Sequence, residues 1–208
     1  MTPQQIAVGT GATLTTAKLW ATAINAACLK FDITTPLRQA AFLSQIGVES
    51  AGLTALREDL NYSEAALLEQ WPKHFTPEDA AAYGRTASHP ANQEMIANIA
   101  YANRYGNGDV ASGDGWLFRG GGAIELTFRD NYKLAGAAIG IDLENHPELI
   151  EQPDVAALAG AWYWYQHGCN RLADNRQIVA ITKEVNGGLI GLPARQRLFA
   201  LASAELAA

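Results

Sequence analysis

Two glutamates nine residues apart, Glu49 and Glu58, have the chemistry of a general acid and a general base. Glu49 is predicted at the end of a largely buried helix, because the segment before it is apolar on more than one side through Leu37, Ala40, Ala41, Phe42, Leu43 and Ile46. Desolvation penalises the charged form of such a carboxyl and keeps it protonated near neutral pH. Glu58 lies in a polar run, where it would stay ionised and serve as a base. Glycoside hydrolysis uses such a pair; the alternative is that both glutamates are ordinary solvated surface groups.

Helix signals surround this pair along the whole chain. N-cap residues followed by proline are expected to begin helices at Thr35 and Thr76, and Ser63 is expected to cap another. Thr127, three residues before Asp130, is predicted to cap the helix that follows it. Further helices are predicted over residues 13–31, 92–105, 128–139, 153–167, 176–185 and 193–207. The fold class is therefore mainly α, with eight or nine helices in a single domain that spans residues 1–208.

Two segments depart from this helical pattern. Residues 106–123 are too rich in glycine for a helix, and they are predicted to form a loop with close backbone approach. At most a small β-hairpin is expected, pairing residues 116–118 with residues 123–126. The aromatic residues 162–165 cannot all face one core, because successive helical residues point about 100° apart. Some of them are predicted to line a groove, or alternatively to pack between two lobes.

Composition argues against several classes of function. The net charge of −6 and the lack of a basic block argue against nucleic-acid and membrane binding through bulk charge. No stretch approaches the ~18 apolar residues of a membrane span, and no export signal is found, so synthesis in a cytoplasm is expected. Cys28 and Cys169 are too few for a disulfide framework, and Cys28 is predicted to be a reduced core thiol. Because the histidines are scattered, neither a metal nor a cofactor is expected.

Several motifs follow one another in the order of a known family. They are AFLSQIGVES, E-x-L-N-Y-S from Glu58 to Ser63, IANIAYANRYGNG, SGDGWLFRGGG, AIELT-x-x-x-NY and VNGG. The series resembles glycoside hydrolase family 19, in particular its small endolysin branch from phages and prophages, over about residues 37–197. The resemblance implies a two-lobed, lysozyme-like fold and an inverting mechanism.

The resemblance also implies roles for individual residues. Glu49 matches the general acid of the family and Glu58 its general base, while Thr127 falls where a hydroxyl helps to hold the attacking water. Substrate binding is implied for five further residues, namely Tyr62, Arg119, Glu125, Asn131 and Asn186.

Three positions depart from the family's pattern. Val48 replaces a histidine, which predicts a more desolvated general acid, and Gly121 replaces one of two arginines. Glu125 replaces a neutral glutamine and would add a third carboxyl to the cleft. Since like charges disfavour one another's ionisation, Glu125 is predicted to shape the pH dependence of activity. The alternative is that it forms a solvated surface pair with Arg119 or Arg129.

The sequence therefore predicts a muramidase-type endolysin that hydrolyses β-1,4 bonds of peptidoglycan glycan strands. A monomer that acts in the periplasm and depends on a holin for export is expected. Three different functions stay open beside it. A chitinase of the same family would cut a neutral glycan, and a lytic transglycosylase would need one catalytic glutamate rather than two. The third is an inactive glycan-binding relative, whose support is the set of departures at Val48, Gly121 and Glu125.

Overall fold

A computed structural model describes residues 1–207, and its secondary structure is helical. The α-helices are α1 (Pro3–Thr10), α2 (Leu14–Lys30), α3 (Pro36–Glu49), α4 (Glu64–Gln70), α5 (Pro77–Tyr83), α6 (Gln93–Tyr101), α7 (Asp114–Leu117), α8 (Arg129–Ile139), α9 (Pro153–Gln166), α10 (Cys169–Asp174), α11 (Ile178–Asn186) and α12 (Leu192–Ala207). Short 3-10 helices are η1 (Val110–Ser112), η2 (Gly122–Ile124) and η3 (Pro147–Glu151). The mainly α class is confirmed, and the predicted helix count was too low.

The predicted helix starts at three caps are confirmed. The Thr35 hydroxyl accepts a hydrogen bond from the backbone N–H of Arg38, and Pro36 occupies the first turn of α3. Ser63 caps α4 in the same way, and Thr76 forms a capping box with Asp79 at the start of α5. These side chains satisfy backbone donors that a helix start leaves without intrahelical partners. Local chemistry therefore fixes where α3, which carries Glu49, begins.

Three local predictions were wrong. The hairpin does not form, because residues 122–124 make the 3-10 helix η2 and α7 occupies residues 114–117. Isolated β-bridges instead pair Gly121 with Arg57 and with Leu126. Thr127 does not cap α8, whose N-cap is Phe128 without a side-chain bond. The helix predicted over residues 92–105 ends at Tyr101, where the chain turns into the glycine-rich segment.

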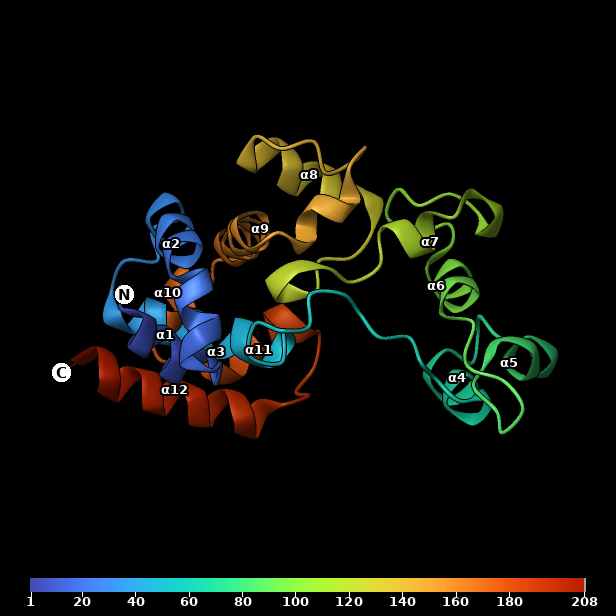
Figure 1. Cartoon of the computed structure of the whole chain (residues 1–208), viewed down its shortest axis with the longest axis horizontal. Helices are drawn as coiled ribbons and strands as arrows, with labels where there is room; N and C mark the ends of the chain where they lie inside the picture. The colour runs from blue at the N-terminus through green and yellow to red at the C-terminus, as the bar shows by residue number, and fades with distance from the viewer. Residues whose placement is uncertain (208) are drawn as a thin grey trace.

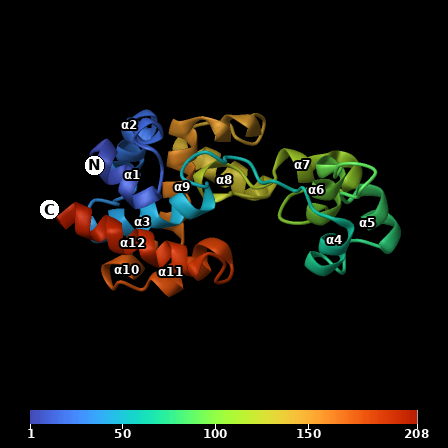
Figure 2. The same ribbon diagram turned by 60° about the horizontal axis from the view of Figure 1, so that its bottom comes forward.

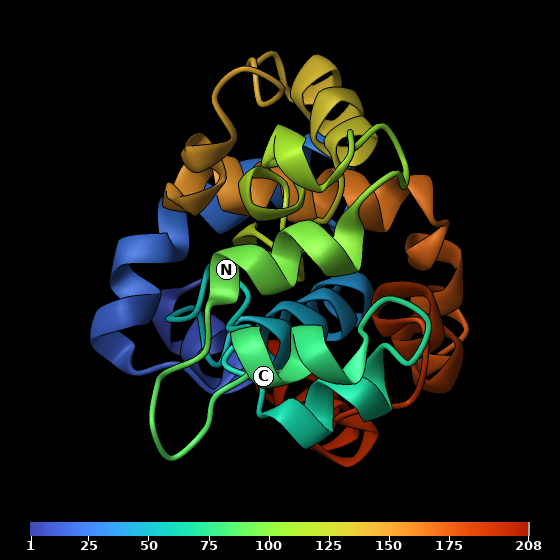
Figure 3. The same cartoon turned by 90° about the vertical axis from the view of Figure 1, so that its right-hand side faces the viewer.

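The chain forms two lobes, which Figure 1 shows at opposite ends of the long axis. The large lobe contains both termini and packs α2 against α9 and α3 against α12. The small lobe consists of α4 to α7 and has a hydrophobic cluster of its own, built around Leu60, Leu67 and Ile96. Figure 2 shows the same separation after a turn about the long axis, and Figure 3 views the molecule from the small lobe. The two lobes are connected by residues 50–63, between α3 and α4, and by residues 118–128, between α7 and α8.

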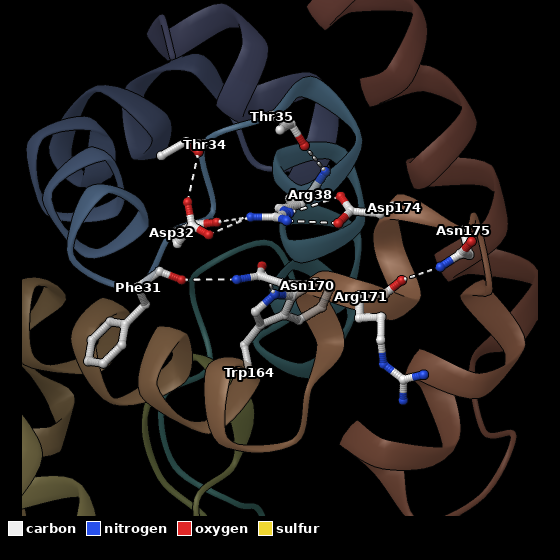
Figure 4. Close-up of polar contacts among 10 residues, drawn as sticks. All are labelled: Phe31, Asp32, Thr34, Thr35, Arg38, Trp164, Asn170, Arg171, Asp174 and Asn175. Carbon is white, nitrogen blue, oxygen red and sulfur yellow. Dashed lines mark hydrogen bonds and ion pairs between the residues drawn. The ribbon is translucent and has the colours of Figure 1, made fainter.

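Arg38 fixes the N-terminal half of α3 within the large lobe (Figure 4). Its guanidinium pairs with Asp32 at 2.6 Å and with Asp174 of α10 at 2.7 Å. Beside this cluster, Asn170 donates to the Phe31 carbonyl and accepts from the indole N–H of Trp164. These contacts join the loop after α2 to α3, α9 and α10. The helix that ends at Glu49 is therefore held in place from several sides.

No helix within residues 1–207 has the length and apolar character that crossing a membrane requires.

Candidate active site

Glu49 is the last residue of α3, and its carboxylate binds Arg195 of α12. The Glu49 Oε1 to Arg195 Nη2 distance is 2.5 Å, and the side chains are 12 % and 1 % exposed. The same guanidinium donates to Gln45 Oε1 at 2.7 Å and to the Ile190 carbonyl at 3.2 Å. The contact between α3 and α12 thus positions the predicted general acid against a buried cation.

Burial raises the pKa of Glu49, against the opposing effects of the Arg195 charge and of the hydrogen bonds to Arg195 and Asn186. The predicted desolvation is present, but its compensation by arginine was not foreseen. Val48, the residue expected to cause the desolvation, is half-buried and lies against Gly191. The net result is a carboxyl whose protonated form is favoured more than in water, as a general acid requires.

Glu58 lies on the segment between the lobes and is held by two hydrogen bonds. The Tyr101 hydroxyl of α6 donates to Oε1 at 2.6 Å, and the backbone N–H of Gly120 donates to Oε2 at 3.2 Å. The neighbouring Arg57 anchors this segment to the large lobe through Glu151, at 2.7 Å, and through the Pro147 carbonyl. These two hydrogen bonds fix the position and orientation of the Glu58 carboxylate, as a general base requires.

A cavity of about 340 Å³ opens beside Glu49. Four further predicted residues line it, namely Glu125, Thr127, Asn131 and Asn186. The rest of the wall consists of apolar residues and of the Tyr163 ring from α9. The lining residues are Glu49, Ile124, Glu125, Leu126, Thr127, Phe128, Asn131, Tyr163, Val185, Asn186 and Gly187. Of the aromatic residues 162–165, Tyr163 lines this cavity. Trp162 and Trp164 are buried, and Tyr165 is exposed outside the cavity.

Glu125 and Thr127 lie on a strained turn at the cavity wall. Glu125 and Phe128 have positive φ values of 55° and 79°. Residues other than glycine adopt such backbone conformations only at a cost in free energy. The Thr127 hydroxyl donates to the Glu125 carbonyl at 2.9 Å. The alternative of a surface pair for Glu125 is wrong, because its side chain forms no ion pair within residues 1–207, and Arg129 binds Asp114 and Glu144 instead.

Of the remaining predicted residues, Asn131 and Asn186 line the cavity, whereas Arg119 and Tyr62 lie outside it. Asn131 donates to the Thr127 carbonyl at 2.8 Å, and the Asn186 Oδ1 atom is buried without a hydrogen-bond partner in the described part of the chain. Arg119 stacks on the Trp116 ring, 3.4 Å from its centroid, and donates to the Trp116 carbonyl. Tyr62 packs edge-on against Trp71 in the small lobe. Neither Arg119 nor Tyr62 lines the cavity beside Glu49.

The missing arginine at Gly121 has a local explanation. A Cβ atom on Gly121 would lie within 3.2 Å of the Tyr132 hydroxyl, an Ile150 methyl group and the Arg57 guanidinium. The Arg57 Nη1 atom also donates a hydrogen bond of 2.9 Å to the Tyr132 hydroxyl. The space where a side chain at position 121 would begin is thus already filled, in part by another arginine.

Sequence reasoning missed Arg195 and Tyr101. A signal for Arg195 existed, because it shares a face of α12 with the buried Leu198 and Ala202, and an arginine on a core-facing stripe needs a buried partner. Tyr101 lies within the motif IANIAYANRYGNG, from which no role was predicted for it. No group of three or more histidine, cysteine, aspartate or glutamate residues that could hold a metal ion occurs within residues 1–207.

Comparisons with known proteins agree on one family. The model of glycoside hydrolase family 19, described as "Chitinase class I", matches residues 65–182. A Haemophilus influenzae protein described as glycosyl hydrolase family 19 domain-containing is 38% identical over 178 residues, which cover 85% of this chain and 84% of that protein. An acidic 27 kDa endochitinase of Solanum lycopersicum is 35% identical over 88 residues, covering 42% of this chain and 36% of that protein.

Solved structures share the fold at low sequence identity. Chitinase C from Streptomyces griseus superimposes with a TM-score of 0.58 at 21% identity, covering 92% of this chain and 74% of that one. The structure of a bacterial family 19 chitinase gives a TM-score of 0.59 at 21% identity and covers 92% of both chains. These matches show the same two-lobed, mainly α architecture.

Proposed function

Because the chain belongs to glycoside hydrolase family 19, we propose that it hydrolyses the β-1,4 glycosidic bonds of bacterial peptidoglycan as a muramidase-type endolysin. One observation carries the proposal: Glu49, a mostly buried carboxyl of raised pKa, lines the same cavity as Glu125, and Glu125 lies close to a second carboxylate, Glu58, that is held by two hydrogen-bond donors. These are the two environments that an acid and a base require.

Each residue has a defined task in the proposed reaction. Glu49 gives its proton to the leaving glycosidic oxygen, and Arg195 then stabilises the carboxylate that remains. Glu58 takes a proton from a water molecule that attacks the sugar carbon, and Thr127 helps to hold that water. The neutral amides of Asn131 and Asn186 face the same cavity and suit the hydroxyl and acetamido groups of an amino sugar.

The choice of peptidoglycan is supported by the motif series that resembles the endolysin branch and by the bacterial relative matched along most of its length. In this proposal the enzyme acts on the periplasmic cell wall as a monomer, with a holin providing its passage from the cytoplasm. Chitin is the second candidate substrate, because relatives and solved structures matched to this chain are named chitinases.

A lytic transglycosylase and an inactive glycan-binding protein are both less well supported. The transglycosylase needs no base, whereas Glu58 is held by Tyr101 and by Gly120. A desolvated acid beside an open cavity is a feature of an active site and argues against an inactive protein. The glycine at position 121 does not argue for inactivity either, because neighbouring groups occupy the space that a side chain there would need. Both observations favour hydrolysis.

Digestion of two glycans in parallel tests the proposal. Purified peptidoglycan and N-acetylglucosamine hexasaccharide are incubated with the enzyme, and the products are identified by mass. Hydrolysed muropeptides with a free reducing end are expected, together with slower or no cleavage of the hexasaccharide. Faster cleavage of the hexasaccharide would instead establish the chitinase. Anhydro-sugar products would establish a transglycosylase, and intact glycans in both samples would contradict any hydrolytic function.

A further inference from the structure

The Glu125 carboxyl faces the cavity without any partner from the protein. Within residues 1–207 its side-chain oxygens take part in no hydrogen bond and no ion pair. Its backbone is fixed on both sides, because Gly121 and Leu126 exchange two hydrogen bonds of 3.0 and 2.8 Å and Thr127 binds the Glu125 carbonyl. The backbone therefore places this carboxyl, while its own hydrogen-bonding atoms remain available for water or a ligand.

The charges around Glu125 disfavour a carboxylate. Oxygen atoms of Glu125 and Glu58 both lie within 3.3 Å of the point that a Cβ atom on Gly120 would occupy, so the two carboxyls face each other closely. Glu49 lines the same cavity, with its charge partly offset by Arg195. An ionised Glu125 would thus meet two other acidic groups.

The two nearby cations are bound elsewhere. Arg57 is held by Glu151, by the Tyr132 hydroxyl and by a backbone carbonyl. Arg119 is stacked on Trp116. Neither forms an ion pair with Glu125, so neither neutralises it directly.

These surroundings change the protonation of the side chain. Burial, then the charge of Glu58 and then that of Glu49 raise the pKa of Glu125 to about 8, against the opposing charges of Arg57 and Arg119. Below that pH the group is a carboxylic acid, which has one donor and free acceptor sites. Above it the group only accepts hydrogen bonds and carries a charge.

We propose that Glu125 is a specificity-determining residue that binds the substrate sugar as a neutral carboxylic acid, donating its O–H to a carbonyl or hydroxyl oxygen of the sugar. The inference rests on the proposed glycosidase function and deepens it. The neighbouring Thr127, Asn131 and Asn186 are also neutral, so the acid form completes a cavity wall that matches the uncharged hydroxyl and acetamido groups of an amino sugar. Substrate binding then weakens as Glu125 ionises.

Michaelis constants measured against pH test this role. Wild type, Glu125→Gln and Glu148→Gln are assayed from pH 6 to 9.5 on both N-acetylglucosamine hexasaccharide and purified peptidoglycan. Glutamine keeps a donor at every pH, and Glu148 is an exposed carboxyl that provides the matched loss of one charge. The wild-type KM should rise about tenfold by pH 9, because about a tenth of the enzyme is then competent to bind. The KM of Glu125→Gln should stay within about twofold, and Glu148→Gln should follow the wild type.

The separation of KM from kcat distinguishes Glu125 from the general acid. Ionisation of Glu49 lowers kcat, whereas loss of the Glu125 donor raises KM. Superimposable KM curves for wild type and Glu125→Gln would overturn the inference. A wild-type KM that stays constant up to pH 9 would also overturn it, independently of the KM of Glu125→Gln.

A stability measurement separates failure of this inference from failure of the proposed function. A carboxyl whose pKa rises from 4.5 to about 8 on folding favours the folded state most at low pH. The melting temperature of wild type relative to Glu125→Gln should therefore fall between about pH 4.5 and pH 8 and then level off. If neither glycan is cleaved, the proposed function fails, yet this fall still supports the neutral Glu125, and a constant difference in melting temperature overturns it.

Discussion

At the residue scale, the pairing of Glu49 with Arg195 decides the properties of the acid. The guanidinium is 1 % exposed and lies against the Glu49 carboxyl, so the carboxylate has a counterion when it is ionised. Burial acts in the opposite direction and is the largest influence on the Glu49 pKa. Burial outweighs the opposing effect of Arg195, because the Glu49 pKa is raised.

Glu49→Gln should abolish hydrolysis, because the amide has the same shape but cannot give a proton to the leaving oxygen. A loss of roughly 10²–10⁴-fold in kcat is expected. The variant also removes the counterion of Arg195, although the amide oxygen still accepts a hydrogen bond from the guanidinium. Because of the lost charge pair, the free energy of unfolding should fall by about 1–3 kcal/mol. Steady-state kinetics and urea unfolding measure both effects, with Glu148→Gln as the control. Retention of more than about a tenth of the wild-type kcat would rule out Glu49 as the general acid.

The sequence allowed the chemistry of Glu49 to be predicted but not its partner. The apolar run before it indicates burial, which is a local property of the helix. Arg195 lies 146 residues further along the chain, and only the packing of α12 on α3 brings it to the carboxyl. The strained backbone at Glu125 and Phe128 was also beyond local patterns, since it depends on contacts with Gly121 and with the small lobe.

At the element scale, helix starts were predictable because their capping chemistry is local. The caps at Thr35 and Thr76 use side chains within three residues of the backbone groups that they bind. The glycine content of residues 106–123 predicted a loop with close backbone approach, but it predicted neither the short helix α7 nor the bridges that pair Gly121 with Arg57 and with Leu126. Tertiary contacts decided its conformation.

Two helical glycines should respond to alanine in opposite ways. A Cβ on Gly47 of α3 would lie within 2.8 Å of backbone atoms of Thr10, so Gly47→Ala should push α1 away and cost about 1–3 kcal/mol. A Cβ on Gly160 of α9 would meet only atoms at 3.8 Å or beyond. Gly160→Ala should therefore be stabilising by up to about 1 kcal/mol, since alanine is the better helix former. Urea unfolding of both variants decides this, and a Gly47→Ala protein as stable as wild type would contradict the close contact.

At the scale of the whole molecule, the two carboxyls belong to different parts of the structure. Glu49 is fixed in the large lobe by α12, whereas Glu58 is bound by Tyr101 of the small lobe. Arg57, next to Glu58, holds the same segment to the large lobe. The relative position of acid and base therefore depends on how the lobes are joined.

Removing the Tyr101 hydroxyl should weaken this connection. Tyr101→Phe deletes a hydrogen bond to a charged group, which is worth about 1.5–3 kcal/mol, so kcat should fall by roughly 10–100-fold. Tyr105→Phe is the matched control, because Tyr105 also packs on Phe128 but is 64% exposed. Kinetics of the two variants are compared on the substrate that wild type cleaves. Equal kcat values for Tyr101→Phe and Tyr105→Phe would show that the hydroxyl does not position Glu58.

The arrangement also predicts the stereochemistry of the product. Both oxygens of Glu58 accept hydrogen bonds, one from Tyr101 and one from Gly120, and this restrains the carboxylate from advancing onto the sugar carbon as a nucleophile. A base that stays back leaves room for water, which requires about 6.5–9.5 Å between the carboxyls and gives inversion. The first product from a β-linked glycan should therefore be the α-anomer. Proton NMR of the reducing end, recorded before mutarotation, measures this directly. A β-anomer as first product, or a glycosyl group trapped on Glu58, would make Glu58 a nucleophile and would require the two carboxyls to approach to about 5 Å during the reaction.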